Sequence, residues 1–196
     1  MTDRDLRLNG LFKQSSRLVL EEHSHCEVPA GCGGVVLRWR LRSLIPLNLF
    51  VQATCKLGFF IDAALPDTGR PLLTPGSHQL ALQLTEVPPS GANFVLAGII
   101  DLEDLPGRQR HRLAPLLSRE DGTWLCSSEE LIGSGWMRRD FDDSAWTAMS
   151  AASMPAEEAD RYQCRQALEA GATPLGTPAP QSTLYVRKKF VLEEGE

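Results

Sequence analysis

The chain has 196 residues, of which 42% are hydrophobic and 23% are charged, and its formal net charge is −5. This is the composition of an ordinary globular protein, which excludes a wholly disordered chain. The mild acidity argues against binding to a nucleic-acid backbone, and no apolar run is long enough to form a membrane-spanning helix. We therefore expect neither nucleic acid nor a membrane as a partner.

The cysteines and the N-terminus bear on the cellular compartment. There are five cysteines, an odd number, and no two of them form a C-x-x-C pair. They are Cys26, Cys32, Cys55, Cys126 and Cys164. The first residues show no charged-then-apolar signal pattern. We expect reduced thiols and a cytoplasmic protein, whereas a truncated sequence would leave secretion open.

The first half of the chain predicts an arm and then strands. Residues 1–16 are polar and are expected to form an N-terminal arm, followed by a single domain over residues 17–196. Residues 37–42 alternate strictly between apolar side chains and arginines. A period of two residues is typical of a half-buried strand. The arginine face is interpreted as a solvated outer face, with a ligand surface as the alternative.

Further strands follow, separated by turns rich in glycine and proline. They are expected at residues 17–22, 47–56, 59–62, 78–84, 93–102, 124–126 and 184–192. Within residues 78–84, the leucines share one face and Ala81 and Gln83 share the other. A polar loop is expected over residues 103–123, and a short helix followed by a loop over residues 150–182. This pattern predicts an all-β antiparallel sandwich with long loops and little helix.

Three ordered segments carry a resemblance to a known family. They are residues 59–82 with FFID and LTPGSHQLAL, residues 121–146 with DGTW, GW and FDDSAW, and residues 184–192 with LYVRKKFVL. Together they resemble the galactose-binding-like jelly rolls attached, as non-catalytic modules, to bacterial alpha-L-rhamnosidases and family 2 glycoside hydrolases. Two features depart from the family pattern. The sequence Asp62-Ala63-Ala64 replaces an Asn-Gly or Asp-Gly turn, and His78 replaces an asparagine.

The resemblance implies a jelly-roll β-sandwich that acts as a non-catalytic carbohydrate-binding module. The alternative is a cytoplasmic protein-interaction or assembly module on the same fold, which binds no sugar. The expected partner is therefore a carbohydrate or a protein, and the oligomeric state stays open. We expect no enzyme activity, with an association with a glycoside hydrolase as the alternative.

Two groups of residues are singled out within the resembling segments. The first is expected to be structural, because short carboxylates accept backbone N–H groups and aromatic rings pack inward; direct ligand contact is the alternative. It comprises Trp124, Phe141, Asp142, Asp143 and Trp146. The second is expected to bind the ligand, and comprises Trp136, Arg138, Tyr185 and Arg187. Because Trp136 lies among glycines, we expect it to be the most exposed tryptophan and to stack on a sugar ring, with simple packing as the alternative.

Other reactive side chains do not form a recognisable site. The group His23, His25, Cys26 and Cys32 matches no common zinc spacing, so we expect no metal site there. The carboxylate pairs Asp142/Asp143, Glu129/Glu130 and Glu157/Glu158 are adjacent in the chain and are expected to diverge, unlike those of a glycosidase. The basic residues Arg108, Arg110, His111 and Arg112 are interpreted as a solvated loop, with an anionic partner as the alternative. No cofactor is expected, although the fold class is compatible with a structural calcium ion.

Overall fold

The computed structural model describes residues 18–22, 39–66, 69–101, 112–177 and 183–193. The chain divides into two compact units, one formed by residues 1–45 and 72–75 and the other by residues 46–71 and 76–196. The expectation of a single domain over residues 17–196 stays a prediction. Several predicted features lie outside the described residues. They are the arm over residues 1–16, the group His23, His25, Cys26 and Cys32, and the basic residues Arg108, Arg110 and His111.

The first unit contains a two-stranded antiparallel ribbon. Strand β1 (Leu18–Glu22) pairs with β2 (Trp39–Ser43), with Leu18 opposite Ser43 and Glu22 opposite Trp39. The strands expected at residues 17–22 and 37–42 are therefore confirmed over their described parts. Strands β3 (Ile45–Pro46) and β6 (Leu72–Leu73) form a second short pair.

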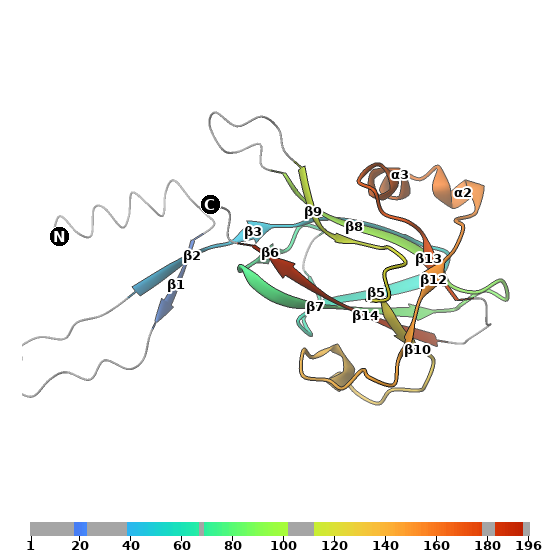
Figure 1. Cartoon of the computed structure of the whole chain (residues 1–196), viewed down its shortest axis with the longest axis horizontal. Coiled ribbons are helices and arrows are strands. Elements are labelled where there is room, and N and C mark those ends of the chain that lie inside the picture. Colours follow the sequence, from blue (N-terminus) through green and yellow to red (C-terminus); the bar gives the residue numbers. More distant parts are fainter. Residues whose placement is uncertain (1–17, 23–38, 67–68, 102–111, 178–182, 194–196) are drawn as a thin grey trace, which may run out of the picture. The chain divides into compact units, whose positions relative to one another are not determined.

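The second unit consists of two antiparallel sheets (Figure 1). The sheet named here the β14 sheet runs in the order β11 (Thr147–Ala148), β10 (Leu125–Ser127), β14 (Thr183–Leu192), β7 (Gly76–Thr85) and β5 (Lys56–Ile61). The β8 sheet runs in the order β12 (Ser150–Ala151), β13 (Leu175–Gly176), β8 (Asn93–Asp101) and β4 (Asn48–Ala53), and β9 (Arg112–Leu117) also pairs with β8. The predicted all-β antiparallel architecture is confirmed.

The central strands of both sheets are buried on both faces. Strand β14 pairs with β7 from Thr183–Thr85 to Leu192–Gly76. The leucines of β7 share one face, as predicted, and they are fully buried. Ala81 on the opposite face is also fully buried. A strand covered on both sides reads as a nearly continuous apolar run, which explains the uniformly apolar sequence of β8.

Each sheet has a further layer on its outer face. Helices α2 (Ala156–Ala159) and α3 (Tyr162–Glu169) lie over the β8 sheet (Figure 1), where Cys164 and Ala167 pack on Val95 and Ala97. The β14 sheet is covered by residues 131–146, named here the covering loop, which contain the 3-10 helix η1 (Gly135–Met137). Within the described residues, no helix is both long and apolar enough to cross a membrane.

Strand β9 lies where the sequence predicted a polar loop, so that part of the prediction over residues 103–123 is wrong. The charged residues before it and Pro115 within it mask the strand pattern in the sequence. Among the described strands β9 pairs only with β8, and proline is tolerated on an edge strand because its missing N–H is not needed there. The fully buried Leu116 holds β9 against the core.

Gly176 in β13 cannot carry a side chain without a rearrangement. A Cβ atom built there would lie 2.1 Å from Asn93 Oδ1 and 2.9 Å from the Cβ of Ala152. We predict that Gly176→Ala lowers the free energy of unfolding by about 1–3 kcal/mol through overpacking. Gly135→Ala is the control, because a Cβ there meets nothing within 4 Å. Urea unfolding measures both variants, and equal midpoints would contradict the prediction.

Candidate functional site

The residues predicted to bind a ligand gather on the outer face of the β14 sheet, and three of the four are buried. Trp136 is 3% exposed, Tyr185 6% and Arg187 1%. The prediction that Trp136 is the most exposed tryptophan is therefore wrong. The glycines beside Trp136 correctly indicate a loop, but this loop lies against the sheet. The Trp136 indole therefore packs edge-on to the ring of Tyr185, with 4.9 Å between the ring centres.

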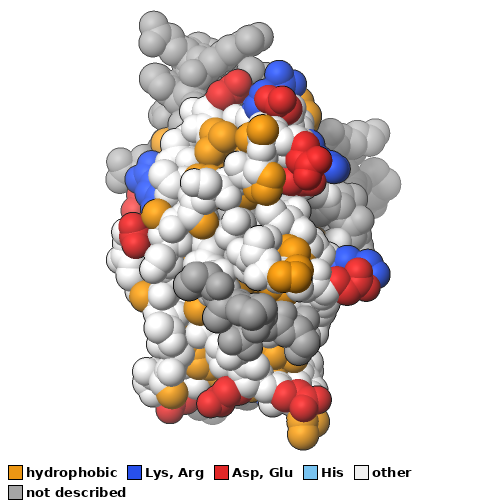
Figure 2. All heavy atoms as spheres, turned by 90° about the vertical axis from the view of Figure 1, so that its right-hand side faces the viewer, with side chains coloured by type: hydrophobic (Ala, Val, Ile, Leu, Met, Phe, Trp, Pro, Cys, Tyr) orange, Lys and Arg blue, Asp and Glu red, His pale blue; other side chains and the backbone are white. Residues whose placement is uncertain are grey.

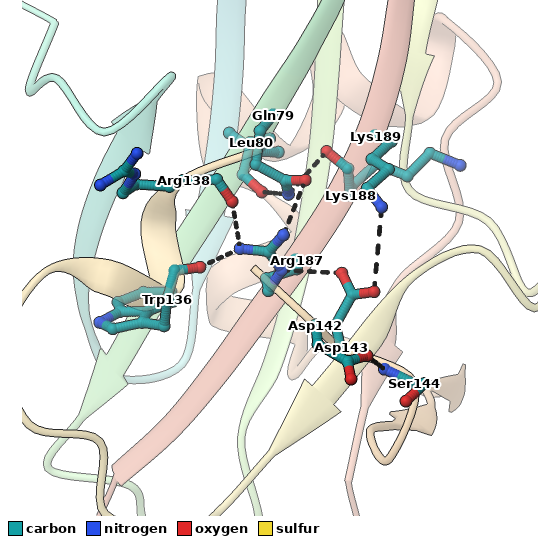
Figure 3. A network of polar contacts seen from close by, with 10 residues as sticks. All are labelled: Gln79, Leu80, Trp136, Arg138, Asp142, Asp143, Ser144, Arg187, Lys188 and Lys189. Carbon is teal, nitrogen blue, oxygen red and sulfur yellow. Dashed lines mark hydrogen bonds and ion pairs between the residues drawn. The ribbon is translucent and has the colours of Figure 1, made fainter. Parts of the chain in front are cut away.

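Arg187 is the centre of a polar network inside this layer (Figure 3). Its Nε donates to Asp143 Oδ2 at 2.8 Å, and its Nη2 donates to Gln79 Oε1 at 3.1 Å. Its Nη1 donates to the carbonyl oxygens of Trp136 and Arg138, the latter at 3.0 Å. Each of the three guanidinium nitrogens thus has an acceptor within the protein. The arrangement holds the covering loop on the sheet and leaves the guanidinium no evident role in ligand binding.

Aromatic rings complete the surroundings of Arg187. Its guanidinium carbon lies 5.1 Å from the ring centre of Phe141 and 5.9 Å from that of Trp146. These two rings are themselves in edge-to-face contact, with 5.8 Å between their centres. A cation over aromatic faces is attracted by the ring quadrupoles. Both rings therefore contribute to packing around the buried charge.

The remaining predicted residues have separate positions. Asp142 accepts a hydrogen bond from the Ser144 N–H at 3.1 Å, and the Ser144 hydroxyl and N–H lower the pKa of Asp142. Trp124 is buried and its Nε1 donates to the Leu117 carbonyl at 2.9 Å. The Arg138 side chain is exposed and pairs with Asp140, with 3.2 Å between Nε and Oδ1. Arg138 therefore contributes its carbonyl to the Arg187 network and its side chain to the surface.

A second charged cluster, which the sequence analysis did not assign, ties the covering loop to β7. Asp62 Oδ2 lies 2.7 Å from Nδ1 of the buried His78, and Asp62 Oδ1 accepts the Gln79 N–H at 2.9 Å. Arg139 donates through Nε and Nη2 to the two carboxylate oxygens, at 2.8 and 2.7 Å. Asp62 and Ala63 have φ values of 50° and 65°, in the left-handed region that glycine usually occupies. In the sequence, the one indication of this turn is that Asp62-Ala63 stands where the resembling family has Asn-Gly or Asp-Gly.

A pocket of about 410 Å³ opens at the end of the sandwich, where the chain passes from β11 in one sheet to β12 in the other. Both of these strands are two residues long, and the side chains that line the pocket are mostly small. They are Cys126, Ser127, Ser128, Glu129, Ala145, Thr147, Ala148, Ser150, Gly176, Thr177 and Leu184. None of the predicted ligand-binding residues is among them. The sequence gives no local signal for this pocket, because its lining comes from five separated strands and the turns beside them.

The pocket is polar but carries little charge. Serine and threonine hydroxyls dominate its lining, and Glu129 is the one ionisable acid among the described lining residues. Thr177 Oγ1 is buried and has no hydrogen-bond partner within the described structure. Burial raises the pKa of the Cys126 thiol, which is therefore uncharged at neutral pH. Figure 2 shows the face of the molecule at the right-hand side of Figure 1, on which the described charged side chains lie mainly around the periphery.

Comparison with protein-family models, curated proteins and solved structures finds no match to this chain. Among the described residues, no group of three or more His, Cys, Asp or Glu side chains is arranged to hold a metal ion. The three described cysteines, Cys55, Cys126 and Cys164, are free thiols. The chemistry of the sandwich-end pocket therefore carries the functional argument.

The Arg187 network predicts that an arginine-to-lysine substitution destabilises the protein much more at position 187 than at position 138. Arg187→Lys keeps the charge but loses the planar fork that serves several acceptors, and we expect it to lower the free energy of unfolding by about 2–4 kcal/mol. The control Arg138→Lys alters an exposed side chain, and we expect it to change the free energy of unfolding by less than about 0.5 kcal/mol. Chemical denaturation compares the two variants. Equal stability of both would contradict the structural role of Arg187.

Asp62 predicts a pH dependence of stability. Partial burial raises its pKa, but the hydrogen bonds from Arg139, Gln79 and His78 outweigh this and lower the pKa to about 2. A carboxyl whose pKa is lowered on folding stabilises the protein above its unfolded value, and this stabilisation is lost as the pH falls through the folded value. Asp62→Asn removes the charge, while asparagine still tolerates the left-handed backbone.

We expect the wild type to exceed Asp62→Asn in stability by about 2 kcal/mol at pH 5, and this difference to shrink towards pH 2. Urea unfolding at several pH values measures the difference. A difference that stays constant from pH 5 to pH 2 would show that the Asp62 charge does not stabilise the fold.

Proposed function

We propose that this chain is a non-catalytic carbohydrate-binding module, a jelly roll of the galactose-binding-like class, whose ligand occupies the sandwich-end pocket. The observation that carries the proposal is a pocket whose described lining includes five serine and threonine residues and one carboxylate. Hydroxyl groups that are open to solvent can exchange bound water for the hydroxyl groups of a ligand.

The chemistry of the lining suits a sugar. Each serine or threonine hydroxyl donates one hydrogen bond and accepts others, as each sugar hydroxyl does. The volume of about 410 Å³ lies at the lower end of the range for small-molecule sites, which favours a ligand of one or two sugar rings. Small lining residues such as Ala145, Ala148 and Gly176 leave room for the ring itself.

The same lining supports binding rather than hydrolysis. Glycoside hydrolysis requires two carboxyl groups on opposite sides of the scissile bond. The described lining residues include a single carboxylate, that of Glu129. They include no aromatic ring either, so affinity would come from hydrogen bonds instead of the stacking expected of Trp136.

Two variants test this function. Thr147 is exposed and lines the pocket, and Thr147→Val keeps the shape of the side chain and removes the hydroxyl, so we expect about fivefold weaker sugar binding with little change in stability. Ser150→Ala is expected to weaken binding similarly. The control is Ser134→Ala, because Ser134 is exposed, lies outside the pocket, and makes no side-chain capping hydrogen bond to η1.

A titration of the ¹⁵N-labelled chain with neutral hexoses, rhamnose and their disaccharides measures these affinities, after a glycan array has identified binders. Chemical-shift changes at Gly176 and Ser150 would support the proposal. If no sugar on the array binds and no titration shifts these resonances, the carbohydrate-binding function is refuted.

A further inference from the structure

We infer that the sandwich-end pocket selects a sugar bearing a protonated amine, an amino sugar, over neutral and acidic sugars. This inference rests on the proposed function, because it concerns the ligand of the same pocket. It follows from the placement of Glu129 among the hydroxyl groups.

The described lining of the pocket carries one negative charge and no positive charge. Among the described residues that line the pocket, Glu129 is acidic and none is a lysine, arginine or histidine. A carboxylate without a nearby cation attracts positive charge and repels negative charge. Glu129 would therefore repel the carboxylate of an acidic sugar, and no cationic side chain among the described lining residues would offset this. It would attract a protonated amine.

The Glu129 carboxylate forms no ion pair with a described residue. Glu129 lies in a bend two residues after the end of β10, and its backbone N–H donates to Ser127 Oγ at 3.2 Å. Across the described part of the chain, no lysine, arginine or histidine forms an ion pair with it. Among the described carboxylates, Glu86 pairs with Lys56 and Glu158 with Arg161, whereas Glu130, like Glu129, forms no ion pair with a described residue. Binding a ligand amine would thus not require breaking an ion pair among these residues.

The pocket combines hydroxyl groups with one carboxylate among its described residues. A small organic cation without hydroxyls, such as an alkyl amine, would use the carboxylate but leave the serine and threonine hydroxyls unmatched. A neutral sugar would match the hydroxyls and could donate an O–H to Glu129, but it would bring no positive charge to the carboxylate. A hexosamine matches both, since one ring carries several hydroxyls and an ammonium group that donates charge-assisted hydrogen bonds.

The experiment compares three probes that differ at one ring position: glucosamine, N-acetylglucosamine and glucose, with galactosamine, N-acetylgalactosamine and galactose as a second set. Titrations are carried out at pH 6, which keeps the amine protonated, and at low salt, which leaves its attraction to the carboxylate unscreened. For at least one set, we expect the free amine to bind about two- to fivefold more tightly than its neutral counterparts, because exposed ion pairs contribute modestly. Added salt should remove this advantage by screening.

The matched variants are Glu129→Gln and Glu130→Gln. Both residues are exposed and adjacent in the chain, but only Glu129 lines the pocket. The preference is the ratio of amine affinity to neutral-sugar affinity measured within each variant. We expect Glu129→Gln to abolish this ratio, whatever its effect on the neutral sugars, and Glu130→Gln to leave it in place.

The outcomes distinguish a failure of the amine selectivity from a failure of the proposed carbohydrate-binding function. If neutral sugars bind as tightly as amino sugars, or if Glu130→Gln removes the preference as fully as Glu129→Gln, the amine selectivity is refuted and the carbohydrate-binding function stands. If no sugar of either kind binds, both are refuted.

Discussion

The arrangement of the second unit depends on one buried cation. A guanidinium cannot lose its proton under ordinary conditions, so Arg187 must be given acceptors wherever it is buried. The covering loop supplies three of them, the carboxylate of Asp143 and the carbonyl oxygens of Trp136 and Arg138. These contacts fix the course of the loop over the β14 sheet, and the Asp62–Arg139 pair fastens it at a second point.

This layer determines where a ligand can bind. With the covering loop on one sheet and α3 on the other, the outer faces of the central strands are already occupied. The sandwich ends remain, and at one of them the strands are short and the side chains small. The chain passes from β11 to β12 through Met149, whose side chain is buried, while the lining residues beside it, such as Ala148 and Ser150, are small and leave a pocket beside Cys126.

The sequence predicts the longer strands well, but it misses β9 and the two-residue strands β11, β12 and β13, and it predicts the surroundings of the strands poorly. Period-two alternation is a local property, so β7 and β14 could be predicted within about one or two residues. Burial of Arg187 and Trp136 depends on a loop some 40 to 50 residues away from Arg187 in the chain folding back on β14, and no local pattern encodes that contact. The same holds for the pocket, whose hydroxyls come from segments that are unremarkable in isolation. Asp62 differs, because an Asp-Ala pair at a tight turn is a local anomaly that indicates an anchored side chain.

The short motifs within the segments that resemble jelly-roll modules contribute mainly to the layer around Arg187, whereas the pocket is lined mostly by residues outside these motifs, such as Ser127, Glu129 and Ser150. FDDSAW contributes Phe141, Asp143 and Trp146 to that layer, and Ala145 alone of its residues lines the pocket. A motif used in this way constrains the scaffold and says little about the ligand. The proposed sugar site consists of hydroxyls and one carboxylate that lie outside FDDSAW, so substitutions there should separate binding from stability where substitutions in the motif cannot.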